Sequence, residues 1–386
     1  MLRIMHVITG LSTGGAEMML YKLLTKVKNT DIEVVVVSLL DRGAIGIRIA
    51  DLGIPIITLG MKRGVPNPIA AMRLIHTIRT IRPALIQGWM YHGNLAATFA
   101  GRFNREATTV LWNIRQSLYE IKNERPLTRL LIRLGSRCSR GPAKIIYNSQ
   151  LSAKQHESIG YAPNKTILIP NGFDLDLFCP DLAARAQIRK QLGIPNDALA
   201  IGLVARYHQM KDHGNFLRAA SLLFKRNKGI HFVMSGRGIS PDNREIWKLI
   251  EEHQLSNNVH LLGERQDVPN ILASLDIATS SSAWGEGFSN AIGEAMACGI
   301  PCVVTDVGDS AFIVGETGLV VAPRDPAALT NAWLKMINAG SEGRQNLGIA
   351  ARQRVIETFS LNAISQQYQN LYDQVAYHES KKPCAA

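Results

Sequence analysis

Two carboxylates stand out in the stretch WGEGFSNAIGEAMACGIP, residues 284–301, where seven residues separate Glu286 from Glu294. Glu286 lies between two glycines, and Glu294 lies in a run of small helix formers that ends at CGIP, residues 298–301. The pattern predicts a loop around Glu286 and a helix that begins near residues 288–290. Glu294 would then lie about 6 Å along the helix axis, at ~1.5 Å per residue. Carboxylates accept hydrogen bonds from hydroxyl groups, whereas the amides of a helix start attract anions.

Two cations occur in the stretch ARYHQMKDHGNF, which begins at residue 205 and follows an apolar run. Arg206 is predicted in the loop, and Lys211 at the start of the next helix. An arginine fork and a lysine point charge can together hold a diphosphate, although a solvated pair of loop cations is the alternative. Combined with the two glutamates, they predict a ligand with a central diphosphate and hydroxyl groups at both ends, which is a nucleotide sugar.

Glycines follow several of the other apolar runs. Gly14 and Gly15, in TGLSTGGAE, precede a predicted helix and would let backbone amides approach a phosphate or a sugar. Their spacing does not match G-x-G-x-x-G, because Ser12 replaces the second glycine, so a plain tight turn is the alternative. Gly236 in SGRG is expected against a flat nucleotide, and Arg265 in LGERQDVPNIL ends a further run.

Short apolar runs alternate with helical patterns along the whole chain, which favours an α/β protein with parallel sheets covered on both faces. The runs predicted as strands are 2–8, 32–39, 54–59, 84–86, 108–112, 145–147, 167–169, 199–205, 231–234, 259–262, 277–279, 302–305 and 319–321. A length of 386 residues exceeds one typical core, so two doubly wound domains facing across a cleft are expected. The predicted boundaries are 1–180 for an acceptor-side domain, 181–358 for a nucleotide-sugar-binding domain, and 359–386 for a final helix that crosses back, plus a tail.

Composition is that of a soluble globular protein, with 46% hydrophobic and 19% charged residues. We find no apolar run near the roughly 20 residues that span a bilayer and no leader pattern. The odd number of scattered cysteines predicts reduced thiols. These are Cys138, Cys179, Cys298, Cys302 and Cys384. A cytoplasmic protein is therefore expected.

The formal net charge of +12 lies entirely in the first half of the chain, where residues 1–180 carry 23 Lys or Arg against 11 Asp or Glu. Arg125, Arg129, Arg133 and Arg137 are spaced to form one stripe on a helix, beside several leucines. Such a helix can lie on an anionic membrane surface, and an ordinary solvated face is the alternative. The sequence has no motif for the recognition of nucleic acid. We therefore expect the chain to bind the inner face of the cell membrane as a peripheral protein.

The motifs resemble those of the retaining glycosyltransferases of family 4, which have the GT-B fold of two Rossmann-like domains. The resemblance rests on Arg206 with Lys211, Glu286 with Glu294, EAMACGIPCVVTDVGD, and IPNGFD at residues 169–174. It implies that Arg206 and Lys211 bind the donor diphosphate. It further implies that Glu286 and the Gly287–Phe288 backbone contact the transferred sugar. The amides of Ser289–Asn290 would contact phosphate, and Glu294 the ribose. Gly14 and Gly15 would face the donor phosphates or the acceptor.

One position departs from the family pattern. Many members have a histidine in the loop after the fifth strand of the first domain, where this chain has Arg115 in LWNIRQSLYE. His92, in QGWMYHGNLAA, resembles a histidine loop of relatives, so either residue is a candidate for the reaction centre. A core histidine is the alternative for His92, and a surface position for Arg115. Asp174 and Asp176 resemble a D-x-D metal motif but are expected to cap a linker helix instead, and no metal is predicted.

The expected activity is metal-independent transfer of a sugar from a nucleotide diphosphate to a glycan or a lipid-linked acceptor, with retention of configuration, in cell-surface polysaccharide or lipopolysaccharide biosynthesis. The expected donor is a UDP-sugar or, alternatively, a GDP-sugar, with no further cofactor. A same-face attack assisted by the leaving phosphate is favoured, because we find no convincing second carboxylate for a covalent intermediate. Two rivals are a nucleotide-sugar epimerase of the same fold and a non-catalytic binding subunit of a polysaccharide assembly.

Overall fold

The computed structural model describes residues 2–27, 32–62, 67–104, 108–119, 121 and 124–380, without the side chains of 377–380. Cys384 lies outside the described residues. The chain divides into two compact units, unit 1 with Met1–Gly172 and Leu361–Ala386, and unit 2 with Phe173–Ser360. The first boundary thus lies at Gly172 and not at the expected residue 180. The reason is Phe173, whose amide donates to the Phe359 carbonyl oxygen at 2.9 Å and whose ring stacks on Phe288 of unit 2.

Unit 1 is built on a seven-stranded parallel sheet with strand order β3-β2-β1-β4-β5-β6-β7. The strands are β1 (Leu2–Ile8), β2 (Ile32–Ser38), β3 (Ile56–Thr58), β4 (Leu85–Trp89), β5 (Thr109–Ile114), β6 (Lys144–Tyr147) and β7 (Thr166–Leu168). The helices are α1 (Gly15–Val27), α2 (Gly43–Asp51), α3 (Pro68–Ile81), α4 (Met90–Gly101), α5 (Pro126–Cys138), α6 (Gln150–Ser158) and α15 (Leu361–Ser380).

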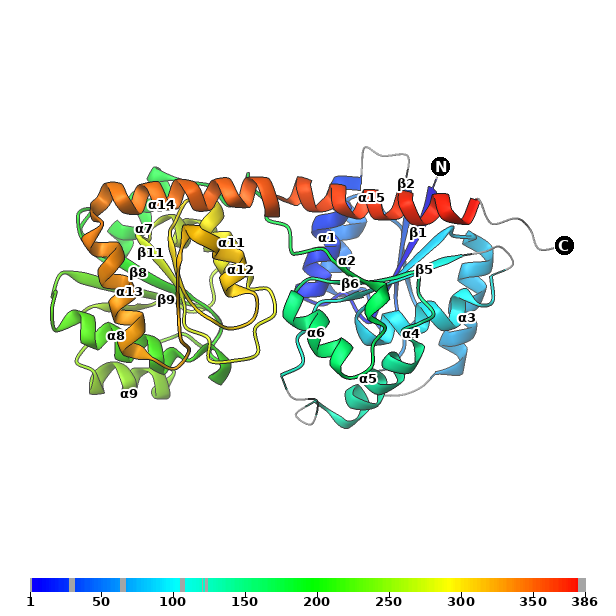
Figure 1. Ribbon diagram of the computed structural model, residues 1–386, viewed down its shortest axis with the longest axis horizontal. Helices are drawn as coiled ribbons and strands as arrows, with labels where there is room; N and C mark the ends of the chain where they lie inside the picture. The colour runs from blue at the N-terminus through cyan, green and yellow to red at the C-terminus, as the bar shows by residue number, and fades with distance from the viewer. Residues whose placement is uncertain are drawn as a thin grey trace. The chain divides into compact units, whose positions relative to one another are not determined.

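The last helix, α15, completes the core of unit 1. Figure 1 shows it, in red, alongside α1. Its buried tyrosines reach the sheet, because the Tyr372 hydroxyl donates to Gln87 Oε1 of β4 at 2.6 Å and Asn113 of β5 donates to the Tyr368 hydroxyl at 2.8 Å. Ile364 and Leu371 add apolar contacts to the same core. A segment that is more than 180 residues away in sequence therefore closes one face of the first sheet.

Unit 2 is built on a six-stranded parallel sheet with strand order β10-β9-β8-β11-β12-β13. The strands are β8 (Leu199–Val204), β9 (Ile230–Ser235), β10 (Val259–Leu261), β11 (Ile277–Ser280), β12 (Cys302–Thr305) and β13 (Leu319–Val321). The helices are α7 (Leu182–Leu192), α8 (His213–Phe224), α9 (Arg244–Glu252), α10 (Val268–Ala273), α11 (Asn290–Ala297), α12 (Ser310–Val314), α13 (Pro326–Asn338) and α14 (Gly340–Arg354). Separate apolar cores lie on the two faces of this sheet, as the continuous apolar strands require.

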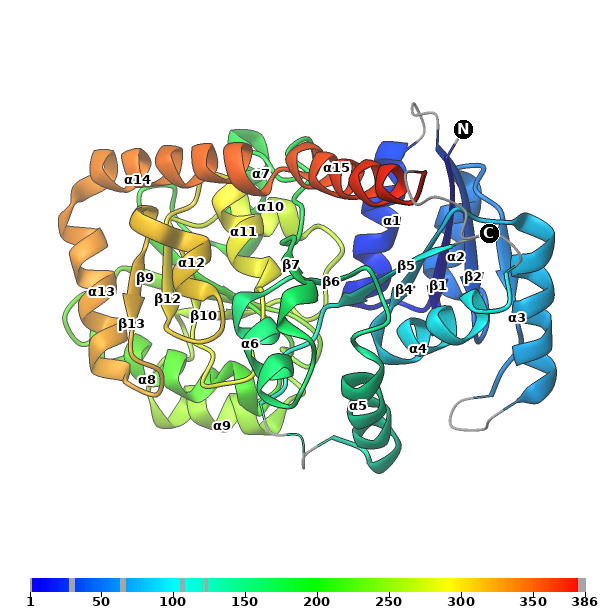
Figure 2. The ribbon, with the colours of Figure 1, turned by 45° about the vertical axis from the view of Figure 1, so that its right-hand side comes forward.

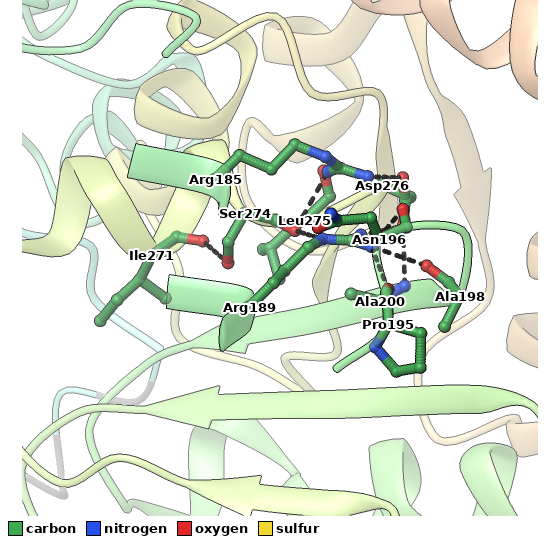
Figure 3. A network of polar contacts seen from close by, with 10 residues as sticks. All are labelled: Arg185, Arg189, Pro195, Asn196, Ala198, Ala200, Ile271, Ser274, Leu275 and Asp276. Atoms are coloured by element: carbon green, nitrogen blue, oxygen red, sulfur yellow. Dashed lines mark hydrogen bonds and ion pairs between the residues drawn. The ribbon is translucent and has the colours of Figure 1, made fainter. Parts of the chain in front are cut away.

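A polar cluster holds the amino ends of β8 and β11 together (Figure 3). Asp276, directly before β11, accepts from the Ala200 amide at 2.7 Å, from Arg185 at 2.8 Å and from Arg189 at 2.6 Å. The Arg189 guanidinium also donates to four carbonyl oxygens, those of Ser274, Pro195, Asn196 and Ala198. The charges are thus paired and hydrogen-bonded inside the fold.

Among the helices of the described ranges, none has both the length and the apolar character needed to cross a bilayer. The cysteines at 138, 179, 298 and 302 are free thiols. Asp174 caps a turn, since its Oδ1 accepts from the amides of Asp176 at 3.0 Å and Leu177 at 3.2 Å. The segment is thus a turn and not the expected linker helix, and this contact explains the D-x-D sequence as local structure.

Buried histidines should make stability depend on pH. Burial lowers the pKa of His6 to about 3. Burial also lowers the pKa of His156 to about 4, although a hydrogen bond with the Ser152 backbone opposes this shift. Between these pKa values and about pH 6.5 the unfolded chain binds a proton at each histidine and the folded chain does not. The contribution of the two neutral histidines to the free energy of unfolding is therefore complete above pH 6.5 and declines as the pH falls. The free energy of unfolding in urea should be lower at pH 5 than at pH 7 by about 2 kcal/mol per histidine.

The variant His6→Asn isolates one of these groups. His6 Nδ1 accepts from the Trp89 indole at 3.1 Å, and an asparagine oxygen can replace that acceptor without titrating. The pH response should become shallower in this variant and stay unchanged in His76→Asn, where the histidine is exposed on α3. An equally steep response in His6→Asn would contradict the assignment.

Candidate functional site

The centre of the sheet in unit 2 is a topological switch point. β8 and β11 are neighbours, and from them the chain proceeds outward in opposite directions, through β9 and β10 on one side and β12 and β13 on the other. Loops at the carboxyl ends of such strands diverge and leave a crevice in which ligands bind. Arg206 and Lys211 follow β8, and the segment 281–289 follows β11. The topology therefore brings the two predicted groups of residues to one end of one sheet.

Hydrogen bonds join these two loops. Lys211 ends a short 3₁₀ turn, Gln209–Lys211, which begins where His208 Nδ1 accepts from the Met210 amide at 3.2 Å. The Ser281 hydroxyl donates to the Lys211 carbonyl oxygen at 2.8 Å, and the Ala283 amide donates to that of Met210 at 2.8 Å. The backbone that carries Lys211 is thus fixed to the loop that carries Glu286.

Lys211 and Glu286 form an ion pair through Nζ and Oε1. The same carboxylate oxygen accepts from the Ser282 hydroxyl at 2.6 Å, and Ser282 is held in turn because its carbonyl oxygen accepts from Thr305 Oγ1 at 2.6 Å. The side chains of Lys211 and Glu286 are 19% and 8% exposed. A partly desolvated ammonium beside an oriented carboxylate can bind an anion and a hydroxyl group at adjacent positions.

A third loop, after β12, fixes the backbone of Glu286. Gly308 has φ +65°, and a Cβ there would lie 2.5 Å from the Glu286 carbonyl oxygen and 2.6 Å from that of Gly287. The Asp309 amide donates to the Gly287 carbonyl oxygen at 2.9 Å. Only glycine combines this φ with so close an approach. The stretch TDVGDS, residues 305–310, thus shapes the site although its residues were not among the predicted ones.

Helix α11 begins at Asn290, within the expected range, with Ser289 as the N-cap residue. The Ser289 side chain makes no capping hydrogen bond. The dipoles of the amides in the first turn favour an anion. The Phe288 ring is buried and packs against Phe173 and Phe359. Its side chain therefore anchors the helix start, and a ligand role is left to its backbone. Glu294 lies one turn into α11 and is partly buried.

The remaining predicted residues of unit 2 lie in loops that follow strands of the same sheet. Gly236 follows β9 with φ +147°, and a Cβ there would lie 2.2 Å from the Ala205 carbonyl oxygen, so the glycine permits the close approach of two strand ends. Arg265 forms a two-bond ion pair with Asp267, at 2.7 and 2.6 Å, which raises the pKa of Arg265 and lowers that of Asp267. Arg265 must therefore share its guanidinium with Asp267 if it binds a ligand. Arg206 is exposed in its loop.

Unit 1 has its own switch point, between β1 and β4. Gly14 and Gly15 precede and begin α1, after β1, and His92 lies in the first turn of α4, after β4. A pocket of about 610 Å³ opens there, and His92 is part of its lining. Burial lowers the pKa of His92. The structure thus places His92 at a pocket of unit 1, which is a more specific setting than a core histidine.

Arg115 follows β5 and makes contacts within unit 1. Its guanidinium donates to the Tyr368 hydroxyl of α15 at 3.0 Å, to the Pro170 carbonyl oxygen at 3.4 Å, and to Asn171 Oδ1. Burial lowers its pKa, and the hydrogen bond with Tyr368 opposes that shift. The contacts give Arg115 a structural role, in which it fastens α15 and the segment before the unit boundary to the end of β5.

Two family models match successive parts of the chain. The model described as "Glycosyltransferase Family 4" matches residues 13–177, and the one described as "Glycosyl transferases group 1" matches residues 198–339. The chain belongs to the family 4 glycosyltransferases. The first model falls on the sheet of unit 1, and the second contains the Lys211–Glu286 pair and α11.

Relatives of this family 4 glycosyltransferase include three bacterial proteins. It is 34% identical to the putative glycosyltransferase EpsF of Bacillus subtilis over 36% of this chain and 35% of the relative. It is 27% identical to an Escherichia coli UDP-Gal:alpha-D-GlcNAc-diphosphoundecaprenol alpha-1,3-galactosyltransferase over 54% of each. It is also 28% identical to the lipopolysaccharide core mannosyltransferase LpsB of Rhizobium meliloti, over 53% of this chain and 58% of LpsB. The chain thus spans about a third to somewhat over half of these relatives.

Solved structures show the same fold over nearly the whole family 4 chain. Anabaena HepE, solved in complex with UDP, has a TM-score of 0.84 at 21% identity and covers 97% of this chain and 100% of its own. WaaG, a glycosyltransferase involved in lipopolysaccharide biosynthesis, has a TM-score of 0.67 at 15% identity and covers 96% and 99%. The expected two-domain, Rossmann-like GT-B fold is therefore confirmed.

Proposed function

We propose that the chain transfers a sugar from a nucleotide-diphosphate-sugar donor to a glycan or lipid-linked acceptor, with retention of configuration, in the biosynthesis of a cell-surface polysaccharide or lipopolysaccharide. The observation that carries the proposal is the pairing of Lys211 and Glu286 beside the start of α11, at the switch point of unit 2. The family supports the class of reaction, and the UDP and UDP-glucose complexes of HepE support a uridine donor. A GDP-sugar remains the second choice of donor.

In this proposal each group has a separate task. As the bond from the anomeric carbon to the diphosphate oxygen breaks, the electron pair goes to the diphosphate. Lys211, Arg206 and the amides at Ser289–Asn290 stabilise that developing charge. Glu286 holds hydroxyl groups of the transferred sugar, and Glu294 those of the ribose.

The acceptor completes the exchange. Its hydroxyl oxygen attacks the anomeric carbon from the face that the diphosphate leaves, and its proton passes to the departing phosphate oxygen. The side chains and helix dipole supply positive charge at the diphosphate, so the proposal requires no metal ion. His92, at the pocket of unit 1, is our candidate for the acceptor side.

We also propose a peripheral position at the cytoplasmic face of the membrane. Arg125, Arg133 and Arg137 are exposed at or on α5, as are Leu127 and Leu130. This combination of cations and apolar side chains on one helix suits an anionic lipid surface.

Thermal stabilisation by nucleotides tests the donor site. UDP should raise the melting temperature more than uridine, because the diphosphate supplies most of the contacts proposed for Lys211 and α11. It should also raise the melting temperature more than GDP, because the proposed donor carries uridine. The free energy of unfolding would rise by about 2.7 kcal/mol at a ligand concentration 100 times Kd. Release of nucleotide on addition of an acceptor extract would then distinguish a transferase from a binding subunit, and an isomerised sugar formed from the donor alone would indicate an epimerase. Equal shifts with UDP and uridine would contradict the diphosphate site.

A further inference from the structure

A second feature of unit 1 is an apolar hollow formed by two pockets. The pocket of about 610 Å³ at the switch point adjoins another of about 380 Å³, and both are lined by Leu39, Met61, His92 and Leu131. Each is in the size range of small-molecule pockets, roughly 300–1,000 Å³. We call these two adjoining pockets the groove.

The walls of the groove are apolar and come from three helices. α3 contributes Ala71 and Leu74, α4 contributes Ala96 and Phe99, and α5 contributes Leu131. Figure 2 shows α5 beside α4, and the two helices are in contact. Phe99 is 50% exposed.

Two of the same helices also expose apolar side chains outside the lining of the groove. Met72 on α3 is 69% exposed and Leu130 on α5 is 61% exposed.

The pocket of about 610 Å³ has an apolar lining too, but it also carries the polar groups of the groove. Its lining contains Thr9, Gly10 and Ser12 of the loop that leads to α1, together with the cations Lys62 and Arg125. Glu17 and His92 are the other titratable groups of that lining. Burial raises the pKa of Glu17 and lowers that of His92. With the positive end of α1 close to this loop, the polar end suits an anionic group.

We propose that the groove binds a lipid acceptor, with its hydrocarbon chain between α3, α4 and α5 and its diphosphate head at Lys62 and Arg125. The inference rests on the proposed function, and it narrows the acceptor to an amphiphile with one long chain. Charge complementarity at one end and apolar walls at the other favour this occupant over a free glycan, which would leave the apolar walls in water. Adsorption to a flat membrane also needs no concave site, because the cations on the outside of α5 can bind the lipid surface.

Farnesyl diphosphate, used below its micelle concentration, is the probe. It should bind at least about tenfold more tightly than either inorganic diphosphate or farnesol, since it alone fills both ends of the groove. Ala96→Trp fills the groove from α4 and should weaken farnesyl diphosphate binding by about tenfold or more. Ala71→Trp, from the opposite wall on α3, is a second obstruction in case the first variant folds poorly. Ala350→Trp, at an exposed position of α14, is the matched control and should bind like the parent chain.

The head of the probe has its own test. The variant Lys62→Ala/Arg125→Ala should weaken farnesyl diphosphate and leave farnesol binding unchanged. Vesicles of phosphatidylglycerol should still bind the Ala96→Trp variant, because the outer face of α5 is intact.

Three outcomes overturn the inference: no binding of farnesyl diphosphate by a chain that still binds UDP, equal binding by the two tryptophan variants and the parent, or loss of vesicle binding together with the probe in Ala96→Trp. Failure of the proposed function would differ, since UDP stabilisation and sugar transfer would then be absent while farnesyl diphosphate still bound.

Discussion

The variant Lys211→Ala is expected to lower kcat by about 10²–10³, the usual cost of removing one group that stabilises developing charge. Lys211 is the cation that the structure fixes most firmly at the switch point. Its carbonyl oxygen accepts a hydrogen bond from the Ser281 hydroxyl, and its Nζ forms an ion pair with Glu286. On donor binding the ammonium can move from the carboxylate to the diphosphate, and Ser282 continues to orient Glu286.

Two variants show whether the loss comes from chemistry or from folding. Lys225→Ala removes a cation from the exposed end of α8 and should retain full turnover. Lys211→Ala leaves Glu286 without its cation, and Lys211→Ala/Glu286→Gln removes that unpaired charge. If the double variant melts like the parent, any instability of Lys211→Ala comes from that unpaired charge, and slow turnover per folded molecule of Lys211→Ala itself then belongs to the reaction. Unchanged turnover in Lys211→Ala at saturating donor would remove the diphosphate role from this residue.

The strands of both sheets could be predicted from the sequence because they are short, apolar and separated by helical patterns. Each of the thirteen runs predicted as strands overlaps a strand of the structure, and the bounds of Cys302–Thr305 and Leu319–Val321 agree. β4 extends to Trp89, beyond the expected residue 86. Its last residues, including Gln87 and Gly88, do not read as apolar, and contacts with α15 and α4 bury them.

The candidate site could be predicted only as far as charge and glycine spacing allow. Lys211 and Glu286 belong to different loops, and their pairing follows from the strand order, which places β11 next to β8. Ser282 carried no signal of its own, since a serine after a strand is common. Gly308 appeared only as part of the motif EAMACGIPCVVTDVGD, with no role assigned to it. The contact of Arg115 with Tyr368 could not be predicted, because the two residues lie 253 positions apart in sequence. Contacts of that kind depend on tertiary structure that no local pattern encodes.

The variant Arg189→Ala is expected to destabilise unit 2 by about 3–5 kcal/mol, the range for breaking a buried ion pair by removal of one partner. The side chain is 1% exposed, and burial lowers its pKa while Asp276 opposes that shift. Without the guanidinium, Asp276 loses one of its two cations and four backbone carbonyl oxygens lose a donor (Figure 3). Each unsatisfied buried group adds to the loss.

The comparison with Arg185 shows how much of the loss of stability in Arg189→Ala depends on burial. Arg185 pairs with the same carboxylate at 2.8 Å, donates to the carbonyl oxygens of Ser274 and Leu275, and is 25% exposed. Because water can replace part of these contacts, Arg185→Ala should cost less than half as much as Arg189→Ala. Arg189→Lys should not restore the parent stability, since an ammonium cannot reproduce a planar fork that reaches several oxygens at once.

Urea unfolding followed by peptide-resolved hydrogen exchange measures the effect in each unit separately. Exchange should accelerate in peptides from residues 173–360 and stay unchanged in peptides from unit 1, because every partner of Arg189 lies in unit 2. The cluster lies at the amino ends of β8 and β11, whereas Lys211 and Glu286 follow their carboxyl ends. Arg189→Ala should therefore lower the folded fraction and leave kcat per folded molecule as in the parent, the opposite of Lys211→Ala. A fall in kcat without a fall in the free energy of unfolding would show that the cluster acts on the site and does not merely hold the two strands together.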